Sequence, residues 1–410
     1  MNVQDSRLLA VLLGACLTGA CGSPSAEHVA STPEQRPTRT LAVETNAYAS
    51  AAAAASAPAS APASASASAS DSAPASAPAS ASASASASVS SSGSACALRP
   101  VCGAPTPPFK QGSFVHNRNA IFSRLSTARH RGRDLFLLPG SPQWVLAKFA
   151  YGPEDKDIED ENVEIHVLRD CGTSWESAGT FRTTTEGSHA EVLGVADGGG
   201  QIYVDLAKVL PGGPLGIGRH RVHLVVPGDG SVVDLYLEVL APGARIAVSD
   251  IDGTLTESEN AVVWDVLTDD KAAANPGAAD VMKELSGRGF YMFYLTARPH
   301  WLEPTTRKWL TMRGFPPGIV HTSVTATGRT GPEAAAFKSG ELSLLKQATG
   351  LVPALGFGNM PSDVIAYSNA GLSKPGTFFF KLAENANGAV VHDDYRTLVP
   401  KLSVLPKSCP

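Results

Sequence analysis

The sequence predicts an α/β domain with a parallel sheet, preceded by an all-β domain. Short alternating strands with Gly/Pro turns occupy the middle of the chain, and apolar runs alternate with helical patterns after Pro242. A third observation marks off the amino-terminal part, since residues 49–95 are Ala, Ser or Pro except at Asp71, Val89 and Gly93. Such a segment has too few large apolar groups to offset its ordering entropy, so it should not fold.

The amino-terminal residues 1–21 resemble an export signal, because the uncharged apolar run at 8–20 is too short to span a bilayer. Cys16 and Cys21 each follow small residues, as in a bacterial lipoprotein signal. Cys16 fits the lipid-attachment pattern better, but Cys21 leaves an apolar run of more usual length, and we favour Cys21 as the anchor. Ordinary secretory cleavage is the alternative. We expect an exported protein of the cell envelope, a membrane-anchored lipoprotein of the bacterial periplasm or outer membrane, with residues 22–95 as a disordered tether.

Charge and cysteine content narrow the choice of partners and compartment. The net charge of −5 argues against a nucleic-acid partner, which requires a basic excess. An exported chain permits disulfides, and four cysteines follow the tether. Cys96 and Cys102 are close enough in sequence to pair, which would leave Cys171 with Cys409, although sequence alone does not determine the connectivity.

Residues 96–243 are predicted to form the all-β domain. From about Trp144 to Leu240, apolar side chains alternate with polar ones in short runs, and Gly/Pro-rich turns separate the runs. The alternation is clearest at Val163, Ile165 and Val167, at Val222, Leu224 and Val226, and at Leu235, Leu237 and Val239. Short strands at regular spacing are typical of a β-sandwich of immunoglobulin type.

Residues 244–410 are predicted to form the α/β domain. Apolar runs expected to be buried strands lie at 245–248, 290–295, 318–321, 354–357 and 377–380. Helical patterns lie at 276–287, 301–313 and 341–348. Strands that alternate with helices predict a parallel sheet with helices on both faces. In such a sheet, the reactive groups lie beyond the carboxyl ends of the strands.

The first candidate cluster is Asp250-Ile251-Asp252-Gly253-Thr254, directly after an apolar strand. One carboxylate, Asp250, can attack phosphorus, and Asp252 can protonate the leaving oxygen and later activate water. A magnesium ion would neutralise these carboxylates and the phosphate oxygens, which otherwise repel one another. Gly253 allows a sharp turn, and we count Gly253 and Thr254 among the residues expected to contact phosphate.

Three further clusters fall at or near strand ends. Thr296 follows the second strand and offers a hydroxyl to a phosphate oxygen, although helix capping is the alternative role. Lys338 lies just ahead of a predicted helix and is a candidate cation for the transferring phosphoryl group, although a lone lysine is usually solvated surface. Asn359 and Asp363 lie four apart after a buried strand, so both can reach one metal ion as the chain turns into a helix.

Together, and in this order, the four clusters resemble the phosphatases of the haloacid dehalogenase (HAD) superfamily. The segment Asp250–Thr256, with Gly358-Asn359 and Asp363, is similar to the catalytic domain of lipins, which are magnesium-dependent phosphatidate phosphatases. The segments Tyr294–Pro299 and Gly314–Gly318 also resemble the C-terminal domain of the retinal-degeneration-B/Nir phosphatidylinositol-transfer proteins. The resemblance covers about residues 244–405 and implies a HAD-like Rossmannoid sheet.

The resemblance also implies a role for each matching residue. Asp250 would be the phosphoryl-accepting nucleophile and Asp252 the general acid and base. Thr296 and Lys338 would bind the phosphoryl group. Magnesium would be surrounded by Asp250, the backbone carbonyl of Asp252, Asn359 and Asp363.

One departure concerns Met360, since lipins usually have arginine there. The transfer-protein relatives lack the first aspartate and bind phosphatidic acid without hydrolysing it, whereas this chain retains Asp250, which favours catalysis. Core helices and strands fill the gaps between the motifs, so no large cap domain is expected and the site should be open.

The sequence therefore predicts a magnesium-dependent phosphatase for phosphatidic acid or a related lipid phosphate at a membrane surface. Two alternatives remain open. One is a binding module for phosphatidic acid without turnover, and the other is the same chemistry on a soluble phosphomonoester or a phosphoprotein. Trp264, Trp301 and Trp309 could contact lipid, but core packing is the simpler expectation for each.

Overall fold

The computed structural model describes residues 96–257, 272–325, 327–383 and 386–409. The predicted export signal, the anchor at Cys21 or Cys16, the tether and Trp264 lie outside these residues and stay predictions. In the part of the chain that is described, no helix is both long and apolar enough to cross a membrane.

The first described region is a β-sandwich, as predicted, and two sheets form it. One sheet has the order β1-β3-β8 and the other the order β2-β10-β9-β6-β7. Their bounds are β1 Arg131–Gly132, β2 Leu135–Leu137, β3 Trp144–Lys148, β6 Asn162–Leu168, β7 Trp175–Arg182, β8 Gln201–Asp205, β9 Gly218–Val226 and β10 Ser231–Val239, with the short pair β4 Ala150–Tyr151 and β5 Lys156–Asp157 alongside. The helical pieces of this region are α1 Asn117–Leu125, η1 Arg169–Cys171 and α2 Leu206–Val209.

Alternation along the strands builds the sandwich core. Val163, Ile165 and Val167 of β6 have no solvent exposure, and they pack in one cluster with buried residues of both sheets. Strands β1 and β2 lie ahead of the expected start near Trp144. The sequence did not predict them, because each is too short to show a period of two.

The second region contains the predicted parallel sheet, with the order β13-β12-β11-β14-β15-β16. Its strands are β11 Arg245–Ser249, β12 Phe290–Leu295, β13 Gly318–His321, β14 Leu355–Gly358, β15 Thr377–Phe380 and β16 Val390–His392. The first strand of this sheet, β11, lies in the middle. Strands β12 and β13 follow on one side of it, and β14, β15 and β16 follow on the other side. This Rossmannoid order makes the carboxyl end of β11 the switch point, where ligands of open α/β sheets bind.

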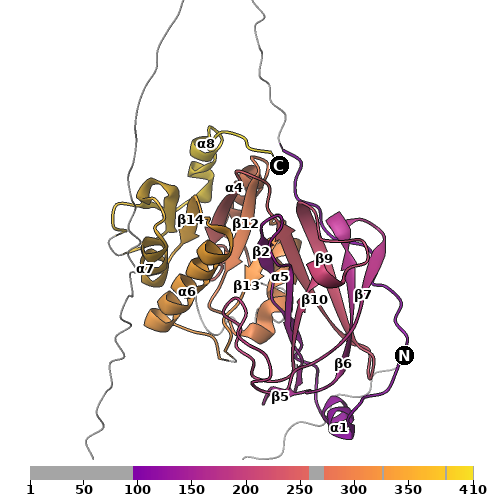
Figure 1. The fold of residues 1–410 in the computed structure, drawn as a ribbon. Helices are drawn as coiled ribbons and strands as arrows, with labels where there is room; N and C mark the ends of the chain where they lie inside the picture. Colours follow the sequence, from indigo (N-terminus) through magenta and orange to yellow (C-terminus); the bar gives the residue numbers. More distant parts are fainter. Residues whose placement is uncertain (1–95, 258–271, 326, 384–385, 410) are drawn as a thin grey trace, which may run out of the picture. The chain divides into compact units, whose positions relative to one another are not determined.

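Helices cover both faces of this sheet (Figure 1). Their bounds are α4 Ala278–Ser286, η2 His300–Leu302, α5 Glu303–Met312, α6 Gly331–Thr349, α7 Pro361–Ala370, η3 Lys374–Gly376, η4 Tyr395–Thr397 and α8 Val399–Leu402. Met292 and Tyr294 of β12 belong to one apolar cluster with residues of α4, α5 and α8, whereas Phe293 and Leu295 belong to another with residues of α6 and α7. In the described part of the chain, helices α4, α5, α6 and α7 join the strands and cover the sheet. The expected lack of a large cap stays a prediction, since residues 258–271 lie outside the described part.

Two sequence predictions need correction. Lys338 lies inside α6 and not ahead of it, because the helix begins at Gly331, with Pro332 in its first turn, and not at Glu341. The disulfides join Cys96 to Cys409 and Cys102 to Cys171, not Cys96 to Cys102. The folded chain brings residues 313 positions apart together, which proximity in sequence could not indicate.

Candidate active site

Asp250 lies directly after β11, at the switch point of the sheet. Its backbone amide donates to the carbonyl of Phe357 on β14 at 2.9 Å, and the residue is 4% exposed. The neighbouring strands β11 and β14 therefore fix the backbone from which this carboxylate projects.

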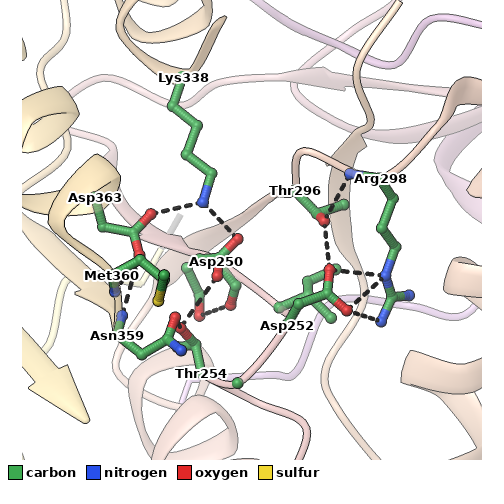
Figure 2. Close-up of polar contacts among 12 residues, drawn as sticks. Asp250, Asp252, Thr254, Thr296, Arg298, Lys338, Asn359, Met360 and Asp363 are labelled. Carbon is green, nitrogen blue, oxygen red and sulfur yellow. Dashed lines mark hydrogen bonds and ion pairs between the residues drawn. The ribbon is translucent and has the colours of Figure 1, made fainter. Parts of the chain in front are cut away.

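Lys338 of α6 joins Asp250 to Asp363. Its ammonium donates to Asp250 Oδ1 at 2.7 Å and to Asp363 Oδ1 at 2.6 Å, and Figure 2 shows the nitrogen between the two carboxylates. All three side chains are buried. One cation thus faces two buried anions, so the group carries an excess negative charge when both carboxylates are ionised.

This charge imbalance affects the acidity of Asp250. The pKa of the Asp250 carboxyl is raised to about 7, mainly by burial and also by the carboxylates of Asp363 and Asp252, against the opposing effect of Lys338. Burial by itself would lower the pKa of Lys338, but Asp250 and Asp363 hold it above its usual value. Lys338 therefore stays charged. The ionised form of Asp250 is less favourable than that of an ordinary aspartate, so additional positive charge nearby would stabilise it.

The turn after Asp250 brings Thr254 back to the carboxylate. Gly253 has φ 69°, a left-handed conformation that glycine adopts without strain. The hydroxyl of fully buried Thr254 lies 3.2 Å from Asp250 Oδ2 and 2.9 Å from Asn359 Oδ1, and it can donate its proton to either (Figure 2). This hydroxyl therefore marks the place where the second oxygen of Asp250 and the amide oxygen of Asn359 converge.

Asp363 is held at the start of α7. Its Oδ2 atom accepts the backbone amides of Asn359 at 3.0 Å and Met360 at 3.1 Å, which leaves Oδ1 for Lys338. Gly358 permits this close approach, because a Cβ atom there would lie 2.5 Å from the Cβ atom of Asp363. Met360, at the position of the lipin arginine, is 44% exposed and brings no charge to the site.

Asp252 forms a second group with Thr296 and Arg298. The guanidinium of Arg298 donates from Nη2 to Asp252 Oδ1 at 2.8 Å and from Nε to Asp252 Oδ2 at 3.0 Å. Thr296 donates its hydroxyl to the same Oδ2 atom at 2.9 Å (Figure 2). The Asp252 side chain is 31% exposed, whereas the Arg298 side chain is 1% exposed and also donates to Thr306 at 2.9 Å.

The structure thus brings all the predicted site residues to one edge of the sheet, in two adjacent groups. Asp250, Thr254, Lys338, Asn359 and Asp363 form one of them. In the other, the Thr296 hydroxyl is committed to Asp252, so a phosphate would have to compete for it. Sequence analysis missed Arg298 as a site residue, although it stands two residues after Thr296, because arginines are usually solvated. Whether these residues perform the predicted roles stays a prediction.

The first group, together with the backbone carbonyl of Asp252, has the oxygen donors that magnesium prefers. Two carboxylates, an amide oxygen and the carbonyl of Asp252 are hard oxygen ligands, and the carboxylates have only one buried cation between them. Among the described residues, no set of three or more His, Cys, Asp and Glu side chains is arranged around a common metal position. A magnesium ion would therefore rest on Asp250, Asp363, Asn359 and the Asp252 carbonyl, and that donor set fits the ion.

Comparison with solved structures finds small phosphatases. A class C acid phosphatase from Bacillus anthracis, with tungstate bound, is 20% identical and has a TM-score of 0.25 over 32% of this chain and 61% of that chain. The apo form of a phosphoserine phosphatase is 13% identical, with a TM-score of 0.28 over 38% of this chain and 98% of that chain.

Comparison of sequences finds longer proteins. Membrane-associated phosphatidylinositol transfer protein 1 from Homo sapiens is 29% identical over 275 residues, which cover 67% of this chain and 20% of that protein. Protein retinal degeneration B from Drosophila melanogaster is 27% identical over 304 residues, which cover 72% of this chain and 22% of that protein. The chain thus spans about a fifth of the length of these relatives.

Two family models match consecutive parts of the chain. The beta-sandwich domain of PITM 1-3 matches residues 128–239, and the LNS2 domain of PITM 1-3 matches residues 247–381. These limits agree with the sandwich and the parallel sheet that the structure contains. The described fold is therefore similar, over both of its domains, to a β-sandwich and LNS2 pair of the PITM proteins.

Proposed function

We propose that the α/β domain is a magnesium-dependent phosphomonoester hydrolase that acts through an aspartyl-phosphate on phosphatidic acid or a related lipid phosphate. The observation that carries this proposal is the buried carboxylate of Asp250, which shares the ammonium of Lys338 with Asp363 at the carboxyl end of β11. A nucleophilic carboxylate beside a fixed cation suits attack on a phosphate, because the cation offsets the charge that develops on the phosphoryl oxygens.

In the first step, a carboxylate oxygen of Asp250 attacks phosphorus and the bond from phosphorus to the alcohol oxygen breaks. Asp252 gives its proton to the departing oxygen, so the alcohol leaves neutral. In the second step, Asp252 takes a proton from water and the resulting hydroxide attacks phosphorus. The bond between phosphorus and Asp250 then breaks, which releases phosphate and restores both carboxyl groups.

Arg298 and Thr296 orient the carboxyl group of Asp252. They hold Asp252 by four hydrogen bonds of 2.8 to 3.1 Å, so its orientation is set before substrate arrives. Asp252 must weaken its contact with Arg298 before it can carry a proton. The arriving phosphate can accept hydrogen bonds from the Arg298 guanidinium in its place. Bound magnesium would supply positive charge to the phosphate and to the carboxylates of Asp250 and Asp363.

The choice of a lipid substrate rests on the relatives. The names of the membrane-associated phosphatidylinositol transfer proteins describe transfer of phosphatidylinositol and membrane association, which supports a phospholipid as the ligand of this chain. The same names describe transfer and not hydrolysis, so a phosphatidic-acid-binding module without turnover is the second candidate. For localisation, we propose export and lipid anchoring at Cys21, with Cys16 as the alternative, on the residue pattern alone.

The decisive experiment measures phosphate release from phosphatidic acid in mixed micelles by the full chain, with magnesium or with EDTA. We expect magnesium-dependent release that Asp250→Asn reduces by at least a thousandfold. The matched control is Asp280→Asn, the same change at an exposed residue of α4, which should keep its activity.

Binding to the micelles without release would support the second candidate. If the chain neither binds nor releases phosphate, the lipid substrate is wrong and soluble phosphomonoesters should be tested next.

A further inference from the structure

A cavity of about 370 Å³ lies between the β-sandwich and the α/β domain. The sandwich contributes residues of β1 and β3 and the segment 194–196, and the α/β domain contributes His300 and residues 320–324 at the end of β13. The volume is within the range of small-molecule sites. Neither the predicted nucleophile nor the predicted metal ligands line this cavity.

The cavity is lined by the carboxyl end of β13, which lies at the same edge of the sheet as Asp250. Strand β12 lies between β11 and β13, so two strand spacings of about 4.8 Å separate the ends of β11 and β13 by about 10 Å. Backbone hydrogen bonds join the two places, since Ser323 donates to Arg298 at 2.9 Å and Thr296 donates to His321 at 3.0 Å. A ligand with its phosphate at Asp250 can therefore enter the cavity if its alcohol part is several bonds long.

His300 gives the cavity a buried polar group. The residue is 6% exposed, and within the described residues neither ring nitrogen meets hydrogen-bond geometry, although the Thr325 backbone lies near enough to the ring to oppose the effect of burial on its pKa. The backbone amide of His300 donates to Thr325 at 3.1 Å, which fixes the residue in place. The Nε atom of Arg133 is buried without a partner in the same wall. Buried polar atoms of this kind are normally satisfied, so water or the polar part of a ligand is expected beside them in the cavity.

The charges around the cavity argue against an anionic ligand group, such as a second phosphate. Arg131 pairs with Asp155 at 2.6 Å, Arg133 with Glu341 at 2.8 Å and Lys148 with Asp157 at 2.6 Å, so each cation already has an anion. Burial, together with Arg131, lowers the pKa of His300, which favours the neutral ring. A neutral imidazole has one donor and one acceptor nitrogen, and hydroxyl or ester oxygens match it.

The rest of the wall is largely apolar. Leu146 and Ala147 come from β3, Val195 from the segment before β8, and Val320 and Val324 from β13 and the residues after it. Apolar walls with a few buried polar groups are typical of sites that bind an alkyl part and orient it by its oxygens.

We infer that this cavity holds the alcohol half of the phosphomonoester, a glyceryl group with or without acyl esters, while the phosphate lies at Asp250. This inference rests on the proposed function and adds to it that the β-sandwich forms half of the substrate site. Phosphomonoesters with only two or three atoms beyond the ester oxygen are then poor substrates, because they cannot reach His300.

The test compares kcat/KM for three substrates: dioctanoyl phosphatidic acid, glycerol 3-phosphate and ethyl phosphate. The cavity variants of the full chain are His300→Phe, which removes the ring nitrogens, and Val195→Trp, which fills the space from the sandwich side. The matched control is Val232→Trp, a change of the same size at a position of β10 that is 47% exposed and does not line the cavity.

We expect both cavity variants to lower kcat/KM for dioctanoyl phosphatidic acid at least tenfold relative to ethyl phosphate, and the control to leave that ratio within twofold. An equal loss for glycerol 3-phosphate would identify the glyceryl oxygens as the contact, and a loss for the lipid alone would identify the acyl esters. An unchanged ratio in both variants would overturn the inference.

A binding measurement separates this inference from the proposed chemistry. Dioctanoyl phosphatidic acid is titrated calorimetrically into Asp250→Asn, alone and combined with each cavity variant. A tenfold weaker Kd in the combined variants supports the cavity even if the parent chain releases no phosphate. An unchanged Kd contradicts the cavity even if the parent chain is an active phosphatase.

Discussion

Two buried charges one turn apart on α6 have opposite surroundings. Lys338 faces the two carboxylates of Asp250 and Asp363, whereas Glu341 faces Arg133 of the sandwich at 2.8 Å and His321 of β13 at 2.6 Å. Burial acts to raise the pKa of Glu341, but Arg133 and His321 lower it to about 2. The pKa of Asp250 is instead raised to about 7.

The difference separates a carboxylate that stabilises the fold from one whose ionised form is disfavoured. Glu341 is surrounded by positive groups, so it strengthens the contact between α6 and the sandwich. Asp250 has less positive charge around it, which is typical of carboxylates at functional sites. Helix α6 therefore supplies a carboxylate to the domain contact and a cation to the proposed site within a single turn.

The largest expected effect on stability comes from Arg133→Met, which leaves Glu341 buried with His321 alone. Loss of one partner of a buried ion pair costs about 3–5 kcal/mol, so the free energy of unfolding should fall by that amount. Urea unfolding followed by circular dichroism measures it. A loss below about 1 kcal/mol would mean that this pair does not hold the two domains together.

Asp250→Asn should increase the free energy of unfolding, the opposite of the effect of Arg133→Met. The substitution leaves one lysine facing one aspartate, and it removes a carboxyl whose folded pKa of about 7 exceeds its unfolded value. The parent chain loses stability as pH rises from the unfolded pKa through the folded one. The variant should therefore be more stable by up to about 4 kcal/mol at pH 8, with no gain below about pH 4. Thermal unfolding at both pH values checks this, and a destabilised variant at pH 8 would contradict the comparison.

Glu341→Gln should cost stability in a pH-dependent way. The folded pKa of about 2 lies below the unfolded value, so the carboxylate stabilises the fold above the unfolded pKa. That contribution is lost as pH falls through the folded pKa. We expect a loss of about 3 kcal/mol at pH 7 that shrinks by about half at pH 3. Urea midpoints of both chains at the two pH values measure the difference, and a constant difference would show that Glu341 acts by packing and not by charge.

Thr254→Val should have the smallest effect, because it removes one buried hydroxyl and keeps the shape of the side chain. The lost hydrogen bond to Asp250 or Asn359 corresponds to about 1 kcal/mol of unfolding free energy. A loss as large as that of Arg133→Met would mean that the reactive group is also a main support of the fold. Both variants should be measured side by side under the same conditions.

The sequence predicted strand bounds correctly where a local run of apolar residues determines the strand. Strands β12, β13 and β15 have the predicted bounds, because each is a short and mostly apolar run with turn-forming or polar residues on both sides. Strand β16 was missed because three residues show no period. Helix α6 begins earlier than predicted, since Ser339 and Gly340 reduce helix propensity locally while packing on β12 and β13 maintains the helix.

Features that depend on distant parts of the chain could not be predicted. The buried clamp of Arg298 on Asp252 requires that β11 and β12 be neighbours, and the contact of Glu341 with Arg133 requires the sandwich to pack on α6. The cavity could not be predicted either, because His300 meets Arg133 and the other residues of the sandwich wall only in the folded chain. Motif spacing locates candidate site residues, but it does not show which residues of another domain lie beside them.

The bond between Cys96 and Cys409 turns the described chain into a covalent ring. A protease that cuts once, anywhere between these two residues, opens the ring without releasing a fragment, since both pieces stay joined through the sulfur atoms. Such a nicked protein would keep its mass in a gel without reductant and separate into two bands once reduced. After a cut within residues 240–244, the two domains would be held together only by their packing and by this one redox-sensitive bond.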